Sequence, residues 1–150
     1  TPARIMQGDK VYVTVYYKNI KEVQASQGAK ISSDDTMEAE KLSVISNEGS
    51  VLNIKVNTDF LTAKANSGGV INITGNTENQ DVLVNSGAFY NGKDLESETV
   101  SVTANAGGEA DIFASKSINA KTRAGGTIIV YGSPKDRNTK NVIGGKIIFK

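Results

Sequence analysis

The chain has 150 residues, and its 17 Lys and Arg residues against 16 Asp and Glu residues leave a net charge of +1. This balance gives no reason to expect nucleic acid or an anionic membrane as the partner. The absence of Cys and His excludes disulfides, thiol nucleophiles, histidine bases and Cys/His zinc sites. No stretch approaches the roughly 20 apolar residues that a membrane-spanning helix needs.

A glycine recurs every 18 to 21 residues along the chain. The series starts at Gly8 and continues through the turn glycines Gly28, Gly49, Gly68, Gly87, Gly107, Gly125 and Gly144. In several units this glycine closes an Asn-x-Gly sequence, in which glycine supplies a positive φ and asparagine tolerates the left-handed region. The spacing therefore predicts a repeat protein with one tight turn per unit.

In chain order, a first strand over residues 11–15 is followed by units in which apolar and polar residues alternate on both sides of the turn. Alternation with a period of two predicts strands. The paired segments are residues 42–46 with 52–54, 61–65 with 71–73, 100–104 with 110–112, and 118–122 with 128–130. We expect the polar segment 32–41 to be a loop that bulges from the wall, and residues 93–98 to be a similar return loop.

Two such strands cannot bury their own apolar side, but stacked coils form one continuous core. The sequence therefore predicts an all-β, single-stranded right-handed parallel β-helix of about seven coils with roughly 20 residues each. No helical pattern, left-handed hexapeptide repeat or calcium-binding nonapeptide is present. Parallel stacking aligns equivalent side chains. It predicts a structural ladder of Asn47, Asn66, Asn85 and Asn105, with Ser26 and Arg123 at its ends, and a candidate outer binding file of Asn53, Asn72, Asn91 and Asp111.

The repeats and the closing segment together resemble the autotransporter-adhesin head GIN domain family of bacterial envelope proteins. The residues that carry the likeness are the runs 69–75 and 126–134, the latter with Tyr131, Gly132 and Pro134, and the turn at Gly144. The likeness covers residues 8–149 and departs at Gly92, which occupies a core position. The resemblance implies a right-handed β-helix with an adhesive role. It also implies an exported location in the periplasm, at the outer membrane or on the cell surface.

Three kinds of site chemistry have simpler interpretations in this sequence. Oxygen ligands of Asp34, Asp35, Glu38 and Glu40 suit a hard cation such as Ca²⁺, but their spacing matches no known loop and favours a solvated acidic segment. Some β-helices cleave polysaccharides with clustered acids, whereas Asp111 is the only acid in its file. The paired glycines precede no helix and so form no phosphate cradle. Five aromatic residues are expected to pack at turns or ends: Tyr12, Tyr16, Tyr17, Tyr131 and Phe149.

We therefore expect one domain over residues 1–150, or a fragment of a longer exported protein, with no enzymatic activity and no cofactor. The favoured function is a surface module that binds a glycan or another surface protein. The alternative is a self-assembling structural β-helix, similar in principle to the polymer-forming bactofilins, with homo-oligomers formed through coil ends or faces. An uncapped terminal coil favours that alternative, because its free backbone groups template further stacking. A polysaccharide lyase or hydrolase is a distant third.

Overall fold

The computed structural model describes the backbone of residues 2–7, 11–16 and 21–150, and the side chains from residue 21 onward. Gly8 and the side chains of Tyr12, Tyr16 and Tyr17 lie outside this part. The described residues form strands and no helix. The strands are β1 (Pro2–Gln7), β2 (Val11–Tyr16), β3 (Glu22–Ala25), β4 (Lys30–Ser46), β5 (Val51–Ala65), β6 (Val70–Val84), β7 (Phe89–Gly92), β8 (Leu95–Asn105), β9 (Glu109–Phe113), β10 (Ser117–Arg123), β11 (Thr127–Tyr131), β12 (Asp136–Val142) and β13 (Lys146–Phe149).

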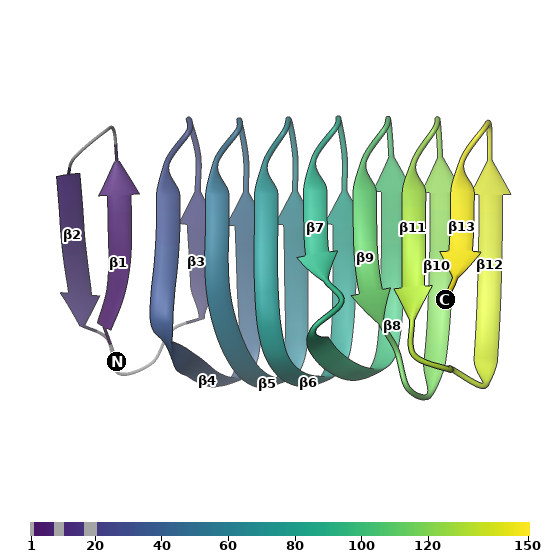
Figure 1. Cartoon of the computed structure of the whole chain (residues 1–150), viewed down its shortest axis with the longest axis horizontal. Coiled ribbons are helices and arrows are strands. Elements are labelled where there is room, and N and C mark those ends of the chain that lie inside the picture. The colour runs from purple at the N-terminus through teal and green to yellow at the C-terminus, as the bar shows by residue number, and fades with distance from the viewer. Residues whose placement is uncertain (1, 8–10, 17–20) are drawn as a thin grey trace.

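The strands from β3 onward stack in parallel, one coil on the next (Figure 1). Leu52 pairs with Ile71, Ile71 with Tyr90 and Tyr90 with Ala110, so these coils advance by 19 or 20 residues. In Figure 1 the chain rises along the rear strands, crosses a tight turn and descends along the front strands while advancing toward its C-terminus. This path is right-handed, as expected of parallel β crossovers. The predicted β-solenoid is confirmed.

Each coil has two long walls. The front wall consists of the first halves of β5 and β6 together with β7, β9, β11 and β13, and the rear wall includes β3, β8, β10 and β12 (Figure 1). Side chains alternate between the interior and the surface, as in β10, where Ile118, Ala120 and Thr122 are buried between exposed or half-buried neighbours. Because of this alternation, the outward-facing residues of successive coils line up on the surface of each wall.

The tight turns have left-handed backbone at two successive residues. In the turn after Asn47, Glu48 has a φ of 53° and Gly49 a φ of 71°, and the Ser50 N–H donates to the Asn47 carbonyl at 3.1 Å. Positive φ at both central residues defines a type I′ turn. The expectation that asparagine occupies the left-handed region is therefore wrong, because the residue between Asn and Gly occupies it. The asparagine side chain is free to serve another purpose.

The segment 32–41 is not a loop, which corrects the expectation from its polarity. It lies within the continuous strand β4, and its pairing with β5 shifts register between Ser32 and Thr36. A bulge absorbs the extra residues, and pairing resumes because Met37 and Leu42 are buried in the core. Residues 95–98 likewise belong to strand β8, so the second expected return loop is confined to a turn at residues 93–94.

Gly92, where the sequence departs from the family pattern, occupies a core position because of the way Tyr90 packs. Tyr90 is fully buried and stacks on Ile71 of the previous coil. Its ring fills the space that a side chain at position 92 would need. A methyl group at position 92 would lie 2.5 Å from Tyr90 Cε1. The Tyr90 hydroxyl donates to Gln80 Oε1 at 2.8 Å, and Gln80 Nε2 donates to Ser97 Oγ at 2.6 Å. Glycine at position 92 therefore allows the core to hold a tyrosine with a satisfied hydroxyl.

Candidate binding surface

The asparagines at the turns form a side-chain ladder, hereafter the turn ladder (Asn47, Asn66, Asn85 and Asn105). Asn66 Nδ2 donates to Asn47 Oδ1 at 2.9 Å, and the same donation at the same distance joins Asn85 to Asn66 and Asn105 to Asn85. These side chains are half-buried beside the type I′ turns. Each inner amide uses one N–H and one oxygen lone pair within the ladder, which suits a role in stacking the coils.

A second row of amides lies on the front wall, hereafter the amide file (Asn53, Asn72, Asn91 and Asp111). Pairing between β5, β6, β7 and β9 places these four residues in direct register. Asn72 Nδ2 donates to Asn53 Oδ1 at 2.9 Å and Asn91 Nδ2 to Asn72 Oδ1 at 3.4 Å. All four are half-exposed. Because an amide has two N–H groups and two lone pairs on its oxygen, each of the three asparagines retains hydrogen-bonding capacity toward a ligand.

Asp111 occupies the position of a fourth amide in this file. Burial raises the pKa of the Asp111 carboxyl above its usual range, Lys93 and Lys150 counteract the rise, and Glu109 adds to it. Glu109 was overlooked in the sequence, although two residues of separation along a strand put both side chains on the same face. The wall thus contains one acid whose charge is disfavoured, next to a second acid that is exposed.

Aromatic side chains flank the amide file. Phe89 lies two residues before Asn91, and Phe113 lies two residues after Asp111 on the same strand. Tyr131 pairs in register with Phe113, and all three are half-exposed. Tyr131, which the sequence predicts to pack at a turn or an end, is the last residue of β11 on the front wall, directly before the bend at Gly132. Alternating strand positions were the signal that could have identified this aromatic flank in the sequence.

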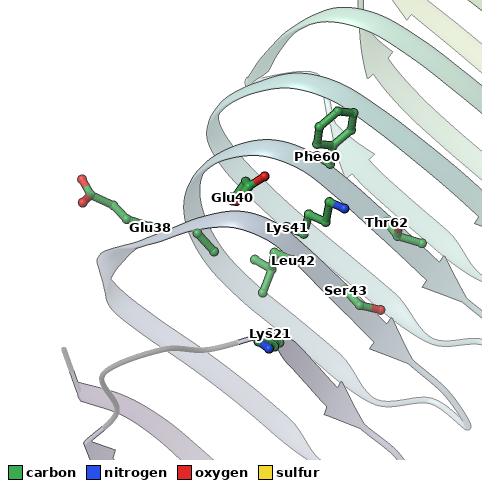
Figure 2. Close-up of a pocket in the computed structure, with 9 residues that line it drawn as sticks. Lys21, Glu38, Glu40, Lys41, Leu42, Ser43, Phe60 and Thr62 are labelled. Carbon is green, nitrogen blue, oxygen red and sulfur yellow. The ribbon is translucent and has the colours of Figure 1, made fainter.

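The acidic residues of β4 do not converge. Asp34, Asp35, Glu38 and Glu40 are all exposed, and Figure 2 shows Glu38 pointing away from its neighbours. Among the residues with described side chains, no group of three or more Asp and Glu residues is placed to hold a metal ion. The arrangement offers no assembled oxygen cage for a hard cation.

Glu38 and Glu40 instead line an open hollow where β4 and β5 bend from one wall to the other (Figure 2). Phe60 contributes its ring to this hollow and is 48% exposed, and Lys41 Nζ lies 5.9 Å from the ring centroid. Ser43 and Thr62 add hydroxyl groups nearby. The hollow is a secondary candidate surface, since Lys21, Ser43 and Thr62 in its lining come from three successive coils, against the four that the amide file joins.

The stacked coils and the exposed files define the class of the molecule, a parallel β-solenoid. Residues 2–134 match the family described as "Putative auto-transporter adhesin, head GIN domain", and the chain belongs to that family. The description fits a location at the cell surface. No curated protein and no solved structure shows significant similarity to the chain. The described residues contain no helix that is long and apolar enough to cross a membrane.

Proposed function

We propose that this domain is a non-enzymatic module of the bacterial cell envelope that binds an extended, hydroxyl-rich polymer along its front wall. The observation that carries the proposal is the amide file, in which Asn53, Asn72 and Asn91 remain half-exposed although they hydrogen-bond one another. Their positions repeat at the coil spacing of about 4.8 Å. Two coils therefore span about 10 Å, close to the length of a disaccharide in an extended glycan.

The aromatic flank strengthens a glycan as the ligand. Sugar rings present apolar C–H faces as well as hydroxyl groups, and aromatic rings with one exposed side suit the apolar faces. Phe89, Phe113 and Tyr131 lie beside amides that can bind the hydroxyls. Each contact is weak, so affinity is expected to grow with polymer length through multivalency.

The last coil argues against the alternative of a self-assembling polymer. The inward positions of β12 that stack on the buried Ile118, Ala120 and Thr122 are Arg137, Thr139 and Asn141. Arg137 lies over the Phe149 ring with its guanidinium 4.4 Å from the centroid, and its Nε donates to the Pro134 carbonyl at 3.0 Å. Inward-pointing charge is a known means of blocking further strand addition.

The opposite end of the stack also departs from the regular coil. Strand β1 pairs antiparallel with both β2 and β4, which interrupts the parallel series there (Figure 1). A head-to-tail polymer would need the same parallel register at both ends. The two ends therefore favour a discrete module, exported as the family description suggests.

The test is an array of glycans and matrix proteins probed with the purified domain, beside a panel of hydrolase and lyase substrates. We expect binding to one or more extended glycans without turnover. Asn72→Glu, on the front wall, should abolish binding, whereas Asn119→Glu, at an exposed asparagine of β10 on the rear wall, should leave it unchanged. Equal loss in both variants would refute the front wall as the site. Polysaccharide turnover abolished by Asp111→Asn or Glu109→Gln would refute the non-enzymatic assignment.

A further inference from the structure

The charge of the chain is strongly segregated along the rod, although its total is near zero. Residues 113–150 contain eight Lys and Arg residues and one Asp, a net charge of +7, whereas residues 31–112 have a net charge of −9. The positive part corresponds to the last coils, at the yellow end of Figure 1. The overall charge of +1 therefore conceals a strongly basic end.

The turn of the last coil has an apolar residue at its tip. The equivalent tip residues of earlier coils are small or polar: Gln27, Glu48, Ser67, Ser86, Ala106 and Ala124. In the last coil this residue is Ile143, which is 78% exposed. Its exposure comes from its place at the tip, since the tip residues of the earlier coils are exposed as well.

The backbone conformation of Ile143 is unfavourable for an isoleucine. Its φ of 57° is in the left-handed region, which β-branched side chains strongly disfavour. Asn or Gly would fit the same turn without that strain. An exposed isoleucine in a strained conformation gains nothing in the isolated domain, and such strain often marks a functional site.

Basic side chains surround the Ile143 tip. Lys140 and Lys146 are exposed and lie three residues away on either side, within about 10 Å along the strands. Exposed Arg123 pairs in register with Val142, and Lys121 with Lys140. The acid of the last coil, Asp136, lies at the far end of β12. An apolar tip within a basic cluster is the pattern that suits the interface of an anionic bilayer.

We propose that this basic tip, defined by Ile143 with Arg123, Lys140 and Lys146, docks the end of the rod on an anionic lipid surface. The isoleucine enters the interfacial region, and the cations contact the phosphate headgroups. The negatively charged middle of the rod is repelled by the same surface, so only the C-terminal coils engage. The front wall then remains free to bind a polymer.

The experiment is co-sedimentation of the purified 150-residue chain with vesicles of mixed phosphatidylglycerol and phosphatidylcholine, or of phosphatidylcholine alone. We expect binding only to the anionic vesicles and a loss of binding as salt is raised. Lys140→Gln should lower the partition coefficient about fivefold, from a contribution of about 1 kcal/mol per basic residue. Lys64→Gln, in the same outward file but in the middle of the rod, should have little effect.

Ile143→Asn separates binding from folding. It should lower the partition coefficient several-fold while raising the melting temperature, because Asn tolerates the left-handed backbone. Ser67→Asn at a central tip should leave binding unchanged. The proposal fails if anionic vesicles are not bound at low salt, or if Ile143→Asn binds as well as the wild type. It also fails if soluble polyphosphate competes fully without dependence on Ile143, which would indicate a general polyanion site.

Discussion

At the scale of single residues, the turn ladder shows how one asparagine in each coil can hydrogen-bond to the coils on both sides of it. Asn66 both donates to Asn47 and accepts from Asn85. Asn66→Ala should remove both hydrogen bonds and lower the free energy of unfolding by about 1–3 kcal/mol. Chemical denaturation measures this, with Asn119→Ala at an exposed site of β10 as the control. Unchanged stability together with lost ligand binding would instead make the ladder a binding site.

The Tyr90–Gly92 pair is a second case in which one residue determines its neighbour. Gly92→Ala should cost about 1–3 kcal/mol, because the added methyl overlaps the Tyr90 ring. The same change should cost clearly less when Tyr90 is replaced by Leu. A double-mutant cycle by thermal or chemical unfolding gives the coupling energy. Additive effects of the two substitutions would show that the ring and the glycine are independent.

Asp111 should make stability depend on pH. Because burial raises its pKa in the folded state, the folded chain holds this proton more tightly than the unfolded chain. The stability linked to Asp111 is therefore complete at low pH and is lost as the pH rises through the raised pKa. Asp111→Asn should be more stable than the wild type at neutral pH, and the difference should vanish below about pH 4. A difference that is constant across unfolding curves from pH 3 to 8 would contradict this assignment.

At the scale of elements, the sequence predicted the walls and turns better than the bends between them. The alternation of apolar and polar residues and the glycine spacing were sufficient to predict the two strands of each coil, because every coil carries this pattern in its own sequence. The segment 32–41 was misjudged because its charges dominate its composition. Met37 and Ala39 alternate with Glu38 and Glu40, which is already the period of a strand, and Met37 is 1% exposed. Alternation marks the aromatic residues of the flank as outward-facing, but the register between distant strands is needed to place Tyr131 beside Phe113.

The bulge in β4 can be tested by deletion. From Ser32 to Thr36 the chain advances four residues while the partner strand advances two, from Asn53 to Lys55. Deleting Asp34 and Asp35 together should restore a regular coil and leave the melting temperature nearly unchanged. Deleting Asn57 and Thr58 from β5 should be strongly destabilising, because both are paired on two sides and Thr58 donates to Thr77 at 3.0 Å. Equal damage from both deletions would show that the bulge is essential.

At the scale of the whole molecule, the two ends of the rod differ from its middle in both pairing and charge. An antiparallel hairpin lies against the first coil, and polar inward positions close the last one. The middle coils have acids along their outer bend, including Asp59, Glu78 and Glu96 around a shallow hollow. Different parts of the rod therefore present different surfaces. The amide file lies on the front wall, and the basic tip lies at the C-terminal end.

The polar inward positions of β12 should be what keeps the last coil from adding further strands. Replacing Arg137 with Leu and Thr139 with Val would continue the apolar files of Ile118 and Ala120 to the end of the rod. We expect this double variant to form dimers or longer assemblies at micromolar concentrations, because an apolar end with free strand edges templates stacking. Sedimentation velocity would detect the change, with Asn138→Val on the outward side of β12 as the control. A wild-type chain that already polymerises, or a double variant that stays monomeric, would show that these residues do not block stacking.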